Sequence, residues 1–301
     1  MTRELRAIVG EATSVAADIA DEDGPWNSPL LRSQAGSELA KQEEQHPPPG
    51  TGSYPWAQTP IIARAGLRAG IEEAKKLEVA LDGEKTSYGA DVLCRAILES
   101  LSLTWWLLDP EIDGAGRVAR LFLFREHTAE ETKRAVTSLG LGDDEDRSEY
   151  GELPSDVKKH AKQLGILLED RKVDGRKVRC CGDQRWLGYT DRVAQLVEHV
   201  WPQGRMPHAV LSAVAHAELL GLTRNVGRME PGAPPSFWPI PDRRGFWLWH
   251  DAYLAVGALL FAAERAAGFL GLTDRASVVH AAKEDLQQQF WRLQPETTPE
   301  E

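Results

Sequence analysis

The sequence lacks the features expected of a secreted or membrane-anchored protein. It has three cysteines, an odd number, and two of them, Cys180 and Cys181, are adjacent, whereas a disulfide framework needs an even and spaced set. The chain opens without a basic segment followed by an apolar one. Its most apolar stretch, residues 247–272, is interrupted by charged side chains, so no membrane span of about 18 apolar residues is predicted. We expect a cytoplasmic protein in a reducing environment, with no membrane partner.

The motifs of common nucleotide-binding, hydrolytic and metal-dependent enzymes are missing as well. No G-x-G-x-x-G, G-x-x-x-x-G-K-[ST], G-x-S-x-G or H-E-x-x-H pattern occurs. A di-iron bundle would carry Glu-x-x-His pairs on facing helices, but Glu43 and His46 lie in a proline-rich segment. The acidic run at residues 143–146 ends in Arg147, where a magnesium box needs another acid. We therefore predict no metal and no cofactor.

The charge balance limits the partners. The chain has 35 basic and 46 acidic residues, a formal charge of −11, which argues against general binding to DNA or to anionic membranes. With 42% hydrophobic and 27% charged residues, the composition is that of a globular protein. The one basic cluster lies in the polar segment 169–188, so only a local basic surface is expected.

Apolar residues recur at helical spacing along most of the chain, and no segment alternates with a period of two. We therefore predict an all-α fold with β content near zero: a single-domain bundle of about eight to nine helices, with long Pro/Gly-rich loops. The predicted helices are residues 3–21, 59–81, 86–108, 116–139, 154–168, 190–200, 206–223, 246–271 and 273–293. The predicted divisions are an N-terminal helix plus Pro/Gly-rich arm packed on the body (1–58), the bundle (59–294) and a disordered acidic tail (295–301).

Polar side chains on otherwise apolar helices are the candidates for a functional site. Burial of a lone charge costs several kcal/mol, so Arg95 and Glu99, which are i and i+4, are expected to pair. Each candidate has a structural explanation, but together they could form one buried Arg/His/Glu site for an anionic ligand or a partner. The predicted catalytic residues are Arg120, His127 and His216, and the predicted binding residues are Arg95, Glu99, Ser212, Trp106 and His250.

Two stretches carry a family resemblance. Arg95-Ala-Ile-Leu-Glu99 with Trp106-Leu-Leu-Asp-Pro110, and Leu211-Ser-Ala-Val-Ala-His216, resemble a functionally uncharacterised helical family of high-GC Gram-positive bacteria. The resemblance covers about residues 60–225 and implies no activity. Members of that family usually have Gly-Thr after the histidine, where this chain has Ala217-Glu218.

More distantly, the chain resembles HEPN-like helical ribonucleases, which are marked by an arginine and a histidine with four to six residues between them. That resemblance implies metal-independent RNA cleavage in a toxin or phage-defence system, by a homodimer, with histidine as acid–base and arginine steadying the phosphorane. It also implies that the basic segment 171–185 lies near the active pair. Pairs with this spacing are Arg275/His280, Arg120/His127, Arg192/His199, Arg244/His250 and Arg243/His250.

Three functions therefore remain open. The first is a helical protein whose buried Arg/His/Glu site binds a small anionic ligand, RNA or a partner. The second is the HEPN-like ribonuclease. The third is a small-molecule enzyme with a pocket lidded by residues 225–245 and lined by tryptophans, namely Trp105, Trp106, Trp247 and Trp249.

Overall fold

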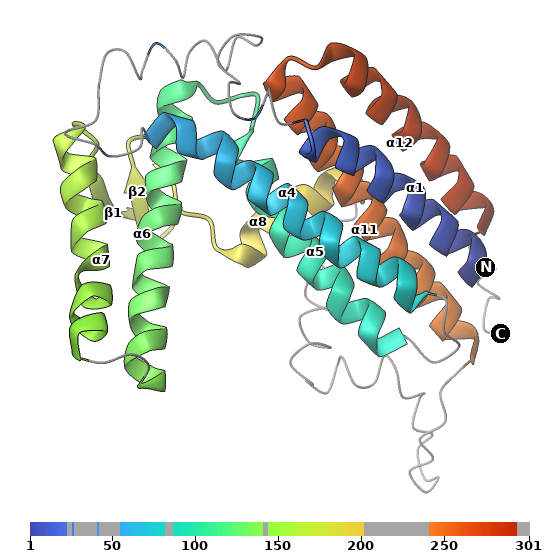
Figure 1. The fold of residues 1–301 in the computed structure, drawn as a ribbon, viewed down its shortest axis with the longest axis horizontal. Coiled ribbons are helices and arrows are strands. Elements are labelled where there is room, and N and C mark those ends of the chain that lie inside the picture. The colour runs from blue at the N-terminus through green and yellow to red at the C-terminus, as the bar shows by residue number, and fades with distance from the viewer. Residues whose placement is uncertain are drawn as a thin grey trace, which may run out of the picture. The chain divides into compact units, whose positions relative to one another are not determined.

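The structure of this chain is a computed structural model that describes residues 1–22, 26, 41, 55–81, 87–140, 144–201 and 241–293. Within these residues it contains eight helices and one three-stranded sheet (Figure 1), which confirms the all-α class. The helices are α1 (Thr2–Ala20), α4 (Pro55–Ala80), α5 (Ser87–Leu107), α6 (Gly114–Leu139), α7 (Asp144–Gln163), α8 (Tyr189–Val200), α11 (Pro241–Leu270) and α12 (Thr273–Leu293). The strands are β1 (Leu168–Val173), β2 (Arg176–Cys181) and β3 (Gln184–Arg185).

Close contacts divide the described residues into two units. Unit 1 contains α1, α8, α11, α12, most of α4 and nearly all of α5, and unit 2 contains α6, α7 and the sheet. The predicted divisions at residues 58 and 294 stay a prediction. The predicted helix 206–223, most of the loop 225–245 and the acidic tail lie outside the described residues.

Helix α11 is the centre of unit 1. It packs against α1, α8 and α12 (Figure 1), and every residue from Trp249 to Leu260 is buried. By length and composition alone, Leu248–Leu270 could cross a membrane, since its most apolar window has a mean hydropathy of 1.4. However, 78% of that window is buried within the protein, which is the pattern of a core helix.

Small residues allow the helices of unit 1 to approach closely. A Cβ added to Gly257 of α11 would lie 2.3 Å from a methyl carbon of Val200 in α8. Between α4 and α5, a Cβ on Gly70 would lie 2.5 Å from Leu101. The hydroxyl of Thr104 donates to the carbonyl of Ala63 across the same interface, at 2.7 Å. These contacts fix which turns of the neighbouring helices meet.

The predicted helix boundaries at 3–21, 86–108, 116–139, 190–200 and 273–293 agree with the structure to within two residues. Three others were wrong. Helix α4 begins at Pro55, before the predicted Thr59-Pro60 start, and α11 begins at Pro241 rather than 246. Helix α7 begins at Asp144, within the run predicted as a loop, because acidic side chains favour the first turn of a helix.

Helix α7 also ends before the predicted residue 168. Gly165 adopts a left-handed conformation, with φ 73°. The amide of Ile166 then donates to the carbonyl of Ala161, and the amide of Gly165 donates to the carbonyl of Lys162. These two hydrogen bonds close the helix in the pattern that glycine favours.

The prediction of almost no β structure was wrong for residues 168–185, which form an antiparallel meander in the order β1-β2-β3. Asp174 and Gly175 link β1 to β2 with φ values of 49° and 76°, the positive values that a tight two-residue hairpin turn requires. Gly182, with φ 56°, begins the second turn. The turn residues create the hairpins although the flanking strands are mostly charged.

The Gly257–Val200 contact predicts a stability effect. Replacing Gly257 with Ala should destabilise the protein by about 1–3 kcal/mol, because a valine side chain cannot move far enough to admit the new methyl group. Urea unfolding followed by circular dichroism measures the change. Gly268→Ala, on the same helix with no atom within 4 Å of the added Cβ, should be neutral or stabilising by up to about 1 kcal/mol. Equal effects of the two substitutions would contradict this account of the packing.

Candidate functional site

Helix α6 holds the meander of unit 2 through side chains one to two turns apart. Arg120 donates to the side-chain oxygen of Gln184 in β3 at 2.7 Å and pairs with Asp109 at 3.2 Å. The ring of His127 stacks on the indole of Trp186, with centroids 4.4 Å apart and planes 29° apart. Two residues predicted as catalytic, Arg120 and His127, therefore contact the segment predicted to be basic.

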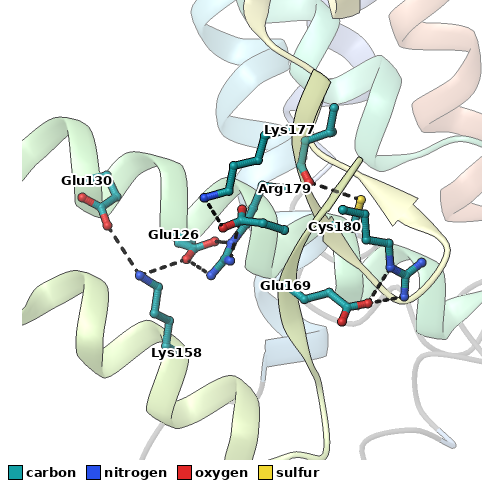
Figure 2. Close-up of polar contacts among 10 residues, drawn as sticks. Glu126, Glu130, Lys158, Glu169, Lys177, Arg179 and Cys180 are labelled. Carbon is teal, nitrogen blue, oxygen red and sulfur yellow. Dashed lines mark hydrogen bonds and ion pairs between the residues drawn. The ribbon is translucent and has the colours of Figure 1, made fainter. Parts of the chain in front are cut away.

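A buried carboxylate makes the strongest contact between α6 and the sheet. Glu126, with a side chain only 7% exposed, accepts two hydrogen bonds from Arg179 of β2, at 2.7 and 2.5 Å (Figure 2). These bonds raise the pKa of the Arg179 guanidinium above its ordinary value. Lys158 of α7 lies 3.3 Å from the same carboxylate and 3.6 Å from Glu130. Glu126 thus joins α6, α7 and β2.

Because side chains alternate along a strand, this contact fixes the orientation of both sheet faces. Arg179 points toward α6, so the neighbouring positions 176, 178 and 180 of β2 point away from it. The register places Arg171 beside Val178 and Arg185 beside Cys180. We use "outer face" for the side of the meander that carries Glu169, Arg171, Val173, Arg176, Val178, Cys180 and Arg185, of which Cys180 is buried.

Two of the three exposed arginines on the outer face have no counter-charge among the described residues. Arg171, Arg176 and Arg185 are all exposed. Arg171 pairs with Glu169 on the same strand (Figure 2), but among the described residues neither Arg176 nor Arg185 has an acidic partner. On the side facing α6, Lys177 pairs with Asp170 at 2.9 Å. Among the described residues of the sheet, the arginines that remain available to bind a partner, Arg176 and Arg185, therefore lie on the outer face.

In unit 1, the expected pairing of Arg95 with Glu99 is present, at 2.8 Å. Trp106, two turns further along α5, is buried beneath the guanidinium of Arg192 from α8, whose carbon lies 5.5 Å from the ring centroid. Arg192 is only 1% exposed, and burial lowers its pKa to about 10. The predicted binding residues Arg95, Glu99 and Trp106 therefore line one helix, and Arg192 is a buried cation near them that was not selected as a binding residue.

His250 lies in the buried part of α11, where its Nδ1 is 3.4 Å from a carboxylate oxygen of Asp251. The thiol of Cys94 in α5 donates to the backbone carbonyl of Asp251 at 3.2 Å. Trp201 covers the His250 ring, with centroids 5.5 Å apart. These contacts join α5 to α11 at Asp251 and pack Trp201, which follows α8, against His250.

No family model, curated protein or solved structure matches this chain. The description of its site therefore depends on its own residues.

The candidate residues fall in different parts of the chain. Arg95, Glu99, Trp106 and His250 belong to unit 1, and Arg120 and His127 to unit 2. Ser212 and His216 lie outside the described residues, so the joined Arg/His/Glu site stays a prediction. Glu126, Arg179, Gln184 and Trp186, which make the contacts between α6 and the meander, were not among the predicted site residues. The readable signal for the last three was the Asp174-Gly175 turn, which predicts a hairpin around them.

The tryptophans of the pocket hypothesis are core residues where the structure describes them. Trp105, Trp106 and Trp249 are 6%, 2% and 0% exposed. The guanidinium of Arg265 covers the Trp105 ring, and the indole of Trp249 donates to the carbonyl of Phe290. The side chain of Trp247 lies outside the described residues. Burial of this kind favours packing over a ligand pocket.

The cysteines are all free and buried. Burial, with a contribution from the nearby Glu126 carboxylate, raises the pKa of the Cys181 thiol to about 11. Cys181 is therefore neutral at physiological pH and a poor nucleophile. Among the described residues, no group of three or more His, Cys, Asp or Glu side chains is arranged to hold a metal ion.

The Glu126–Arg179 contact predicts a second stability effect. Glu126→Gln should destabilise the protein by about 2–3 kcal/mol, since it leaves a largely covered guanidinium with only the more distant Asp170 carboxylate, at 3.4 Å, as counter-charge. Glu131→Gln, which removes an exposed partner of Arg134 on the same helix, should change stability by less than about 0.5 kcal/mol. Chemical denaturation of both variants tests the difference, and a Glu126→Gln protein as stable as the control would show that the pair contributes little.

Proposed function

We propose that the protein binds single-stranded RNA on the outer face of its meander. The observation that carries this proposal is the pair Arg176 and Arg185, exposed on one sheet face and without an acidic partner among the described residues. Residues 168–185 contain six basic and four acidic side chains within a chain of charge −11. The basic surface is thus local, as expected for one binding face rather than for general attraction to polyanions.

The chemistry of this face favours a single strand. Guanidinium groups bind phosphate oxygens in a bidentate manner and stack on exposed bases. Val173 and Val178 are partly exposed between the arginines and offer apolar contact to base faces. Proteins recognise single-stranded RNA through such open sheets, where unpaired bases can spread over side chains. The contacts of Glu126 and His127 on the other side keep the sheet in place.

Charge reversal on the outer face tests the proposal. The Arg176→Glu, Arg185→Glu double variant should bind a ten-nucleotide single-stranded RNA at least tenfold more weakly, because two phosphate contacts become repulsive. The slope of log K against log salt should also fall in magnitude by about 1.4, the value for two phosphates on a single strand. Fluorescence anisotropy across a salt series measures both quantities.

The matched control reverses two exposed cations on α6 of the same unit, Lys133→Glu and Arg134→Glu, and should bind within twofold of the wild type. If the control and outer-face variants weaken RNA binding equally, the effect comes from net charge alone and the proposal is contradicted. Absence of RNA binding by the wild type would also contradict it. Tighter binding of duplex DNA than of single-stranded RNA would also contradict it.

A HEPN-like ribonuclease is the second candidate, favoured by the contacts that Arg120 and His127 make with the meander. In this mechanism His127 transfers protons while Arg120 stabilises the phosphorane, with no metal. Arg120 is held by Asp109 and Gln184, so an RNA phosphate would have to replace these partners.

Cleavage in the presence of EDTA tests this candidate. His127→Ala should lower the cleavage rate at least 100-fold, in the range of lost acid–base catalysis, and His199→Ala, the exposed histidine of another Arg/His pair, should not. If the wild type binds RNA but does not cleave it, the nuclease candidate is contradicted and the proposal of RNA binding is not.

We also propose a cytoplasmic location, supported by the three free, buried cysteines. A homodimer, relationship to the helical family of high-GC Gram-positive bacteria, and a joined ligand site that includes Ser212 and His216 remain proposals based on sequence.

A further inference from the structure

A third arginine of unit 2, Arg125, also has no counter-charge among the described residues. Arg125 of α6 is partly buried, and its Nη1 atom is covered by protein without any hydrogen-bond acceptor. Its guanidinium carbon lies 5.4 Å from the centroid of the Phe122 ring. Burial alone lowers its pKa, and no described carboxylate opposes that effect.

His160 of α7 meets Arg125 at the same aromatic ring. The imidazole approaches Phe122 edge-on, with centroids 5.5 Å apart and planes 80° apart. Burial first, and then the positive charge of Arg125, lower the pKa of His160. The side chains of Arg125 and His160, from neighbouring helices, therefore both contact the ring of Phe122.

The other described arginines of α6 each have an acceptor or a carboxylate within the protein, although two nitrogens of the buried Arg117 also lack an acceptor. Arg117 donates to the carbonyl of Asp109, Arg120 pairs with the Asp109 carboxylate, and Arg134 pairs with Glu131. The carboxylates nearest to Arg125 along the helix are already engaged, since Glu126 binds Arg179 and both Glu126 and Glu130 face Lys158 (Figure 2).

A covered guanidinium nitrogen without an acceptor costs free energy unless something binds it. We propose that Arg125 and His160 form a site between α6 and α7 for a phosphate-type oxyanion, either free phosphate or the phosphate group of a small molecule. The guanidinium offers parallel N–H donors that match two oxygens of a phosphate, and the imidazole offers a further donor. Phe122 excludes water from one side, which strengthens these hydrogen bonds.

This site is separate from the proposed RNA-binding function. Arg125 is about 160° around α6 from His127, because successive residues advance about 100° in a helix, and it faces α7 rather than the meander. A small anion held there needs neither Arg176 nor Arg185.

Titration with inorganic phosphate, followed by isothermal calorimetry and by the thermal unfolding midpoint, tests the site. Wild type should show saturable binding and a midpoint that rises with phosphate concentration. Arg125→Gln should weaken binding at least tenfold, and His160→Asn should weaken it measurably. Arg134→Gln removes an exposed arginine of the same helix and should bind as the wild type does. Since Arg125→Gln also removes a packed charge, Arg125→Lys is the second variant. It keeps the positive charge but removes the paired N–H donors of the guanidinium, and it should lose most of the affinity for phosphate.

Three results would overturn the site: no saturable binding by wild type, equal loss in Arg134→Gln, or unchanged affinity in both Arg125 variants. The Arg176→Glu, Arg185→Glu protein distinguishes this site from the outer face, since it should bind phosphate normally whether or not RNA binding fails. Repeating the titration with a nucleoside monophosphate separates the sources: tighter binding than inorganic phosphate indicates a phosphorylated small molecule, and equal binding indicates the phosphate group alone.

Discussion

The bidentate contact between Glu126 and Arg179 is the interaction on which the candidate site depends. A carboxylate that is 7% exposed must be neutralised, and the partner that reaches it comes from a strand 53 residues further along the chain. A meander whose longest strands have six residues is too small to be stable alone, since isolated hairpins are marginal in water. The sheet is held by α6, and Glu126 decides which face turns outward.

The same carboxylate explains why α7 belongs to this unit. Lys158 reaches Glu126 and Glu130 from α7, and the ring of His160 packs on Phe122. The contacts are partly apolar and partly ionic, and they lie on one face of α6, because Phe122, Glu126 and Glu130 are four residues apart. One helix therefore organises unit 2: one flank binds the meander, another binds α7, and its N-terminus is capped by Asp113, which accepts from the amide of Gly116.

Contacts between residues close together in the sequence could be predicted, whereas contacts between distant residues could not. Arg95 and Glu99 are four residues apart on one helix, so their pairing could be predicted from spacing alone, and the structure has it. The left-handed Gly140 at the end of α6 was predictable for the same local reason. Arg179 and Trp186, which contact Glu126 and His127 from the meander, lie more than 50 residues away, and no local pattern identifies them. The hairpin was readable from Asp174-Gly175, but charged residues occupy both faces of its strands and obscure the period of two. Sequence periodicity reports burial, and in the three strands only Cys180 and Cys181 are buried.

Unit 2 uses its arginines in three environments, and the environment determines which anion each one suits. Arg120 and Arg179 pair with carboxylates of the protein, and the buried Arg117 donates to the carbonyl of Asp109. Arg176 and Arg185 are hydrated, so an anion gains little at each one, and several phosphates of a flexible strand must act together with a strong dependence on salt. Arg125 has already lost much of its water on folding, so a single oxyanion in close contact gains more there and is screened less. The exposed arginines therefore suit a polyanion, and the covered arginine suits one small group.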